Sequence, residues 1–95
     1  MVVLDRNWRC DAGEIDLVLR DGGVLVVCEV KTRTSHACGS PHEAVTSDKV
    51  ARLRRLAARW VTEHDLHPPG IRIDLVAVTM QRRGMPLVEH VEGLD

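Results

Sequence analysis

Two adjacent glycines divide a run of strand-forming sequence, and this feature constrains the fold more than any other. Residues 14–20 (EIDLVLR) alternate polar and apolar side chains, apart from Val18, as a half-buried strand does. Asp21-Gly22-Gly23 then indicates a tight turn, because glycine reaches positive φ at little cost. Residues 24–31 (VLVVCEVK) are rich in valine and favour a second strand. Together the two segments predict an antiparallel hairpin.

The register of this hairpin sorts its side chains by charge. With Gly22-Gly23 as a two-residue turn, Asp16 lies opposite Glu29 and Glu14 lies opposite Lys31. One face is then wholly apolar and is expected to pack on the core; it comprises Ile15, Leu17, Leu19, Val24, Val26, Cys28 and Val30. The other face carries Val18, Leu25, Val27 and Arg20 near the turn and the four charged residues at the open end. A slip of one residue would destroy this segregation, which supports the register.

Three carboxylates and one ammonium at one end of a hairpin suggest chemistry. Directly opposed like charges repel by up to ~1 kcal/mol even on an exposed sheet. A Mg²⁺ ion would reverse that sign, since it prefers one or two protein carboxylates with water and substrate phosphate completing its octahedron. The lysine could orient or deprotonate an attacking water or hold the phosphate. The cluster fits metal-assisted phosphodiester hydrolysis. The alternative is a surface ion pair between Glu14 and Lys31, with Asp16 and Glu29 merely solvated.

The remaining segments predict an α/β fold. Residues 1–8 read as extended, 33–46 as a loop, 71–79 as a central strand and 87–91 as an edge strand. A helix capped by Thr46 or Ser47 runs to about His64. The strand–helix–strand crossover makes the strands at 24–31 and 71–79 parallel. We therefore predict one domain over residues 1–95, with a mixed β-sheet that combines an antiparallel hairpin and a crossover helix.

The predicted helix carries an apolar stripe and a basic exterior. The stripe follows helical spacing and comprises Val50, Leu53, Leu56, Ala57, Trp60 and Val61. Lys49, Arg52 and Arg59 lie broadly on one flank, and Arg54 and Arg55 lie on others. Residues 49–59 contain no acid, so this surface is a candidate for nucleic-acid phosphates. An ordinary solvated helix exterior is the alternative.

Composition excludes several classes of protein. Of 95 residues, 44% are hydrophobic and 28% charged, which is typical of a small globular domain. With no Phe or Tyr and only Trp8 and Trp60, the chain lacks an aromatic platform for stacking bases. No segment reads as a membrane span or signal peptide. Three scattered cysteines argue against a disulfide framework and favour the cytoplasm. The net charge of −1 makes charge distribution matter more than its sum.

Three other groups of residues admit a chemical interpretation. His36, Cys38 and His42, with Cys10, could ligate zinc, but their spacing matches no common zinc pattern. Ser35 and Ser40 have no acid–base partners in a recognisable order, so a serine nucleophile is discounted. Asp74 lies mid-strand among apolar residues and needs a partner, either an arginine or the carboxylate cluster. Nothing indicates a small-molecule cofactor.

In this order, the motifs resemble the YraN family of small bacterial proteins over nearly the whole chain. The matching segments are Asn7-Trp8-Arg9, Gly13-Glu14-Ile15-Asp16-Leu17-Val18, Glu29-Val30-Lys31-Thr32-Arg33, Gly39-Ser40-Pro41, Glu43-Ala44-Val45, Lys49 with the arginine-rich run to Trp60, and Arg72-Ile73-Asp74. The family is similar to archaeal Holliday-junction resolvases within the PD-(D/E)XK nuclease superfamily. The resemblance implies a restriction-endonuclease-like core, which here lacks the usual first helix and its Gly-Glu pair. A sheet without that helix is expected to expose apolar surface.

The resemblance also implies roles for individual residues. Asp16 and Glu29 would bind Mg²⁺ or Mn²⁺ together with the carbonyl of Val30, and Lys31 would be the catalytic lysine. Glu14 and Asp74 would be accessory. DNA would be the substrate, with branched DNA as one candidate, held by Arg33 and by the helix residues Lys49, Arg52, Arg55 and Arg59. A resolvase needs two active sites, which implies a homodimer. The alternative is a catalytically silent nucleic-acid-binding or assembly module that keeps the fold.

Overall fold

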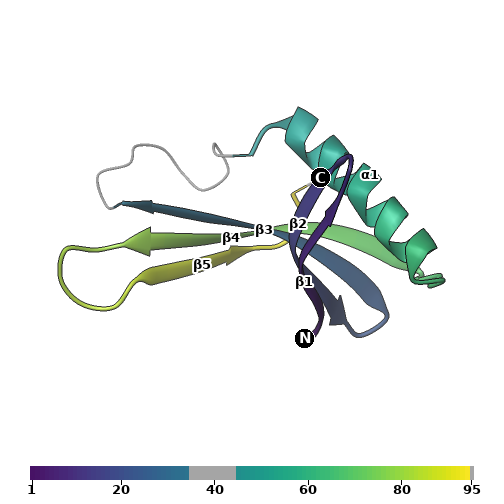
Figure 1. Cartoon of the computed structure of the whole chain (residues 1–95). Helices are drawn as coiled ribbons and strands as arrows, with labels where there is room; N and C mark the ends of the chain where they lie inside the picture. Colours follow the sequence, from purple (N-terminus) through teal and green to yellow (C-terminus); the bar gives the residue numbers. More distant parts are fainter. Residues whose placement is uncertain (35–44, 95) are drawn as a thin grey trace.

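A computed structural model describes residues 1–34 and 45–94 of the chain. Its elements are β1 (Val2–Cys10), β2 (Gly13–Asp21), β3 (Val24–Thr34), α1 (Ser47–Glu63), β4 (Gly70–Met80) and β5 (Leu87–Val91). The five strands form one sheet in the order β1-β2-β3-β4-β5. The β3–β4 pair is parallel and the other three pairs are antiparallel. The predicted mixed α/β sheet, with a helix between parallel strands, is therefore confirmed (Figure 1).

The ends of several elements differ from the prediction. β3 continues through Arg33 and Thr34, where a loop was expected, because β4 runs beside it as far as the Thr34–Met80 pair and supplies backbone hydrogen bonds. β1 likewise extends to Cys10, which pairs with Gly13. The helix begins as predicted: Thr46 is its N-cap and accepts the backbone N–H of Lys49 at 3.2 Å. Of the described residues, none form a helix with both the length and the hydrophobicity of a membrane span.

α1 covers one face of the sheet, which we call the helix face. Its buried residues Leu53, Leu56 and Ala57 pack in one cluster with Val27 and Ile73 of the central strands. Val18 and Leu25, on the charged side of the hairpin, belong to the same cluster. A further contact ties the helix to β1, where the Trp60 indole N–H donates to Asp5 at 2.9 Å. The face of the hairpin that carries the carboxylates is thus the one beneath the helix.

This arrangement corrects the predicted core. The apolar face of the hairpin was expected to meet the core, but it forms a smaller second cluster on the far face of the sheet, away from α1. That cluster consists of Leu19, Val26 and Cys28, with Leu17, Val24 and Val76 packed against it. Ile15 was predicted on the same apolar face, but it does not join the far-face cluster. It packs in the cluster beneath the helix instead. β2 pairs with β3 only from Leu17 to Asp21, and Ile15 follows its β1 partner Trp8 instead.

Candidate functional site

β2 and β3 separate at the open end of the hairpin, and Asp16 lies where they part. Their pairing ends at Leu17 and Cys28, so the predicted register holds from there to the turn. Beyond it, the Asp16 carboxylate accepts the backbone N–H of Val30 at 2.8 Å. A strand residue directs its N–H and C=O toward the same neighbouring strand. The Val30 carbonyl therefore lies on the same edge of β3 as Asp16.

Glu29 and Lys31 project from β3 onto the helix face, one residue on either side of Val30. The Lys31 ammonium lies 3.8 Å from a Glu29 oxygen. The first turn of α1 adds Lys49, whose ammonium is 2.9 Å from the same oxygen. The Glu29 side chain is 14% exposed, so this acid is largely enclosed between two lysines. The structure thus brings Asp16, Glu29 and Lys31 to one place.

Asp16 and Glu29 line a pocket between the strands and the helix, and Lys31 lies next to Glu29. Its volume is about 240 Å³, and its lining comprises Glu14, Asp16, Glu29, Lys49, Arg52, Leu53 and Leu56. Six waters occupy ~180 Å³ in the liquid, so the pocket is large enough for a hydrated divalent ion. Gly13 lies against two of the lining side chains: a Cβ there would lie 3.2 Å from the Arg52 guanidinium and 3.3 Å from Leu56, and the φ of Gly13 is +148°.

Lys31 and Lys49 influence each other. A hydrogen bond to Lys49, together with the charge of Lys49, lowers the pKa of Lys31; burial lowers it further, while Glu29 and Asp16 oppose the change. A lower pKa increases the fraction of Lys31 that is a neutral amine, the form that can accept a proton from water. Sequence reasoning assigned Lys49 to a nucleic-acid surface and missed its contact with Glu29. That contact depends on how α1 docks, for which no local sequence signal exists.

Glu14 has a different partner from the one predicted. It faces Arg9 of β1, and the two side chains form an ion pair at 2.7 Å. The expected opposition of Glu14 and Lys31 does not form, because β2 has left β3 by that point. Glu14 still lines the pocket, so it lies beside Asp16 without contacting Lys31.

The donor set of the pocket fits a hard divalent cation. Mg²⁺ and Mn²⁺ take carboxylate and carbonyl oxygens, and Asp16 and Glu29 supply carboxylates to the pocket. Val30 is not among its lining residues; together with Asp16 it lines another hollow. The contacts of Asp16 with Val30 and of Glu29 with its lysines each use one carboxylate oxygen. Three carboxylates are not gathered around one point, however. Among the described residues, the only trio of His, Cys or acidic ligand atoms within 4.8 Å is Cys28, Asp74 and His90.

That trio lies on the far face, so Asp74 is remote from the pocket. Asp74 pairs with Cys28 across the strands, and alternation directs it away from the side that Glu29 and Leu75 share. The Arg72 guanidinium donates to both its oxygens, at 2.9 and 3.0 Å, and the Gly93 N–H donates at 3.0 Å. His90 Nε2 lies 2.7 Å away. Asp74 was predicted to pair either with an arginine or with the carboxylate cluster, and its partner is the arginine, Arg72.

The cluster around Asp74 has a structural role. Burial raises the pKa of Asp74, but hydrogen bonds from Arg72, Gly93 and His90 outweigh it and hold the pKa below its ordinary value. Burial, with the charge of Asp74, raises the pKa of the Cys28 thiol to about 12, so Cys28 stays a neutral core side chain. A bidentate cation already balances the carboxylate, which leaves a metal little to gain.

The predicted nucleic-acid residues divide into two groups. Lys49 and Arg52 line the pocket, and Arg59 forms an ion pair with Asp11 in the β1–β2 turn, so these three share the predicted flank. Arg55 is exposed on α1, and Arg33 is half-buried near the end of β3, on the same face as Lys31. Arg33 continues the row of Glu29 and Lys31 along the strand.

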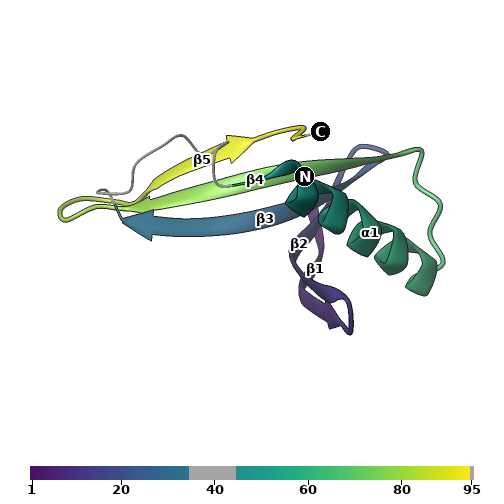
Figure 2. The same cartoon turned by 90° about the horizontal axis from the view of Figure 1, so that it is seen from above.

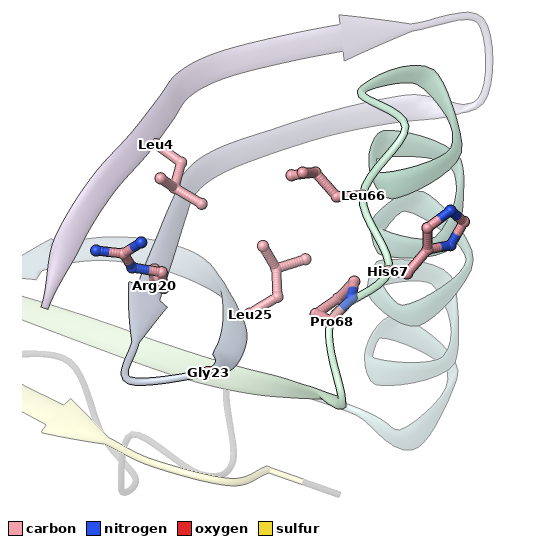
Figure 3. A pocket seen from close by; sticks show the side chains of 7 residues that line it. All are labelled: Leu4, Arg20, Gly23, Leu25, Leu66, His67 and Pro68. Carbon is pink, nitrogen blue, oxygen red and sulfur yellow. The ribbon is translucent and has the colours of Figure 1, made fainter.

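A second hollow of about 230 Å³ lies beyond the C-terminal end of α1. Its lining includes Leu4, Leu25, Leu66 and Pro68, and Figure 3 shows the three leucines pointing toward one another. Val2, Val3 and Leu4 of the edge strand β1 are exposed nearby. This hollow lacks a cluster of catalytic groups among its lining residues. The residues considered as zinc ligands, His36, Cys38 and His42, lie outside the described residues, as do Ser35 and Ser40.

Comparison with known proteins gives close relatives. The profile of the uncharacterised protein family UPF0102 matches residues 1–78, which include every pocket residue. A UPF0102 protein of Nocardioides sp. is 66% identical over 94 residues, covering 99% of this chain and 76% of that protein. One from Kineococcus radiotolerans is 58% identical, with 100% and 79% covered. The UPF0102 protein SCO5602 of Streptomyces coelicolor is 60% identical, with 99% and 74% covered.

Proposed function

The chain belongs to the uncharacterised protein family UPF0102, and from its pocket we propose that it is a metal-dependent, nuclease-like protein that binds DNA and cleaves its phosphodiester bonds. Membership agrees with the YraN-like motifs; the link to the PD-(D/E)XK nucleases is part of the proposal. One observation carries it. Asp16 on β2 and the Glu29-Val30-Lys31 segment of β3 meet where the two strands separate.

The proposed roles follow from the positions of these residues. Asp16, Glu29 and the Val30 carbonyl would hold Mg²⁺ or Mn²⁺, which when bound polarises a phosphodiester and lowers the pKa of a water ligand. Lys31, with its lowered pKa, would orient the attacking water or accept its proton. Arg52 would hold a phosphate oxygen at the pocket rim. Glu14 would support the site through its contact with Arg9, whereas Asp74 has no proposed role in it.

The positive charges around the pocket support a polyanionic substrate. The described part of the helix and of β3 presents Lys49, Arg52, Arg33 and Lys31 on or near the side of the carboxylates, and Arg55 is exposed elsewhere on α1. Phosphate contacts of this kind make binding depend on salt, with log K falling by ~0.9 per contact for duplex DNA. A second copy of the chain would supply the second site that cleavage of branched DNA requires.

The direct experiment is a cleavage assay on linear and branched DNA with Mg²⁺ or Mn²⁺. Cleavage is expected for the natural chain, and Glu29→Ala or Lys31→Ala should abolish it while the circular dichroism spectrum is unchanged. Glu63→Ala, at the exposed end of α1, is the matched control and should cleave normally. Cleavage that survives both Glu29→Ala and Lys31→Ala would refute the assignment.

One observation favours a second candidate, a nucleic-acid-binding module without catalysis. The Lys49 ammonium already balances Glu29 at 2.9 Å, so the pocket is electrostatically stable without a metal. Such a module would bind DNA with the same salt dependence, cleave none, and retain its affinity after Glu29→Ala. The cleavage assay and a binding assay on the same variants separate the two functions.

A further inference from the structure

The ends of three strands form an arm that extends away from the helix. β3 and β4 stay paired to Thr34 and Met80, and β5 returns beside β4 from Leu87. Figures 1 and 2 show these strand ends projecting from the side of the molecule opposite the helix and the β1–β2 hairpin. The molecule is accordingly elongated, measuring 44 × 26 × 22 Å. The β4–β5 turn is the tip of this arm.

The tip has an unusual composition for a solvated turn. All of its residues 81–86, with the sequence QRRGMP, are exposed, and the Met85 side chain is 83% exposed. Arg82 and Arg83 form no ion pair with any carboxylate in the described parts of the chain. Leu87 and Val88 next to the tip are exposed as well. Adjacent cations without an acid, combined with exposed apolar side chains, suggest a surface that meets a polyanion with an apolar interior.

The arm continues the pocket along one face of the sheet. Glu29, Lys31 and Arg33 alternate onto the helix face of β3, and Arg33 lies opposite Thr79 of β4. Thr79, in turn, lines a shallow hollow with Gln81, Arg82, Arg83 and Leu87. A strand rises ~3.3 Å per residue, so Arg33 is ~13 Å from Glu29 along β3. That distance spans about four base pairs at ~3.4 Å each.

We propose that the tip, residues 81–86, enters the minor groove of the duplex that the pocket contacts, a few base pairs from the phosphate held there. Arginine and glutamine with a methionine or proline wedge are the side chains that such contacts use. The inference rests on the proposed DNA-binding function and adds the second contact and its location. The apolar side chains alone would also suit a second copy of the chain. The adjacent arginines favour DNA, because tips of two copies that met would repel each other.

The test measures binding of a fluorescent DNA duplex in EDTA, so that it does not depend on a metal. The double variant R82Q/R83Q removes two exposed charges without removing a packing contact. R20Q is the control, because Arg20 is also exposed but lies on β2 near the β2–β3 turn, at the opposite end of the sheet from the tip. The double variant is expected to bind at least about tenfold more weakly, with the slope of log K against log salt reduced by ~1.8 for two phosphate contacts. M85S should reduce the preference for A·T over G·C duplexes.

The outcomes separate this inference from the proposed function. Unchanged affinity and salt slope in R82Q/R83Q would overturn the inference, even where D16N and E29Q abolish cleavage. Loss of self-association in M85S, with DNA binding intact, would overturn it in favour of a second copy as the partner. Loss of DNA binding in R82Q/R83Q supports it whether or not the chain cleaves.

Discussion

The Lys49 ammonium lies 2.9 Å from Glu29, so the first turn of the helix supplies the counter-charge for an acid on the neighbouring strand. If Glu29 binds a divalent ion, Lys49 competes with that ion. Lys49→Gln is expected to lower the metal-free stability by about 0.5–1 kcal/mol, the value of a partly exposed ion pair, and to strengthen stabilisation by Mg²⁺. Urea unfolding with and without Mg²⁺ measures both effects. Lys49→Arg keeps the charge and is the control; a Mg²⁺ response unchanged in Lys49→Gln would argue against competition.

The cluster around Asp74 is expected to act on stability alone. Asp74→Asn leaves the Arg72 guanidinium without its buried partner and should cost about 3 kcal/mol in free energy of unfolding. Asp21→Asn is the matched control, because Asp21 contacts the same arginine at 3.1 Å but is far more exposed, and it should cost less than ~1 kcal/mol. Urea unfolding at neutral pH compares the two variants. Equal costs would contradict the dominant role of Asp74.

The buried thiol of Cys28 makes stability depend on pH in the alkaline range. Its pKa is about 12 in the folded chain against an ordinary 9.0, so the unfolded chain loses the proton first. The stabilising contribution is fully present below pH 9 and is lost as pH rises toward 12, by up to ~1.4 kcal/mol per pH unit. The difference between the pH profiles of the natural chain and Cys28→Ala isolates this effect. Parallel profiles would show that the thiol titrates normally.

Gly13 is expected to resist substitution. Its φ of +148° strains any other residue, and an added Cβ would lie 3.2 Å from Arg52 and 3.3 Å from Leu56. Gly13→Ala should therefore destabilise the chain by about 1–3 kcal/mol and displace Arg52 from the pocket. Gly23→Ala, whose Cβ would make only an ordinary contact with Pro69, is the control. Thermal unfolding of both variants provides the measurement, and equal melting temperatures would count against the strain.

The sequence predicted the hairpin and its register from the turn to the Leu17–Cys28 pair, because the Gly22-Gly23 turn and the alternation of the strands agree with each other there. The predicted Asp16–Glu29 and Glu14–Lys31 pairs do not form. The helix and its cap were equally accessible, since Thr46 and the apolar stripe are local signals. The face of the sheet that α1 covers could not be predicted. Both faces of the hairpin are apolar near the turn, and nothing in the sequence states that α1 covers the side of Val18 and Val27 rather than that of Val26 and Cys28.

The candidate site was predictable only in part, because local sequence signals do not determine how β2 pairs with β1 or how α1 packs on the sheet. The sequence placed Asp16 near Glu29 and Lys31 through a register in which Asp16 pairs with Glu29. That pair does not form; Asp16 reaches β3 through the Val30 N–H instead. The separation of β2 from β3 beyond Leu17 could not be predicted, because it depends on the pairing of β2 with β1. Because the strands separate, Glu14 forms an ion pair with Arg9, and the Asp16 carboxylate accepts the Val30 N–H. Lys49 joins the site only through the packing of α1 on the sheet.

Calorimetric titration of the protein with Mg²⁺ tests the central claim most directly, because it requires neither DNA nor turnover. The natural chain should bind the ion, whereas D16N and E29Q, which keep the shape of each side chain, should each lose this binding while E63Q retains it. A natural chain that binds no Mg²⁺, or D16N and E29Q variants that bind it as tightly as the natural chain, would contradict a metal site between β2 and β3.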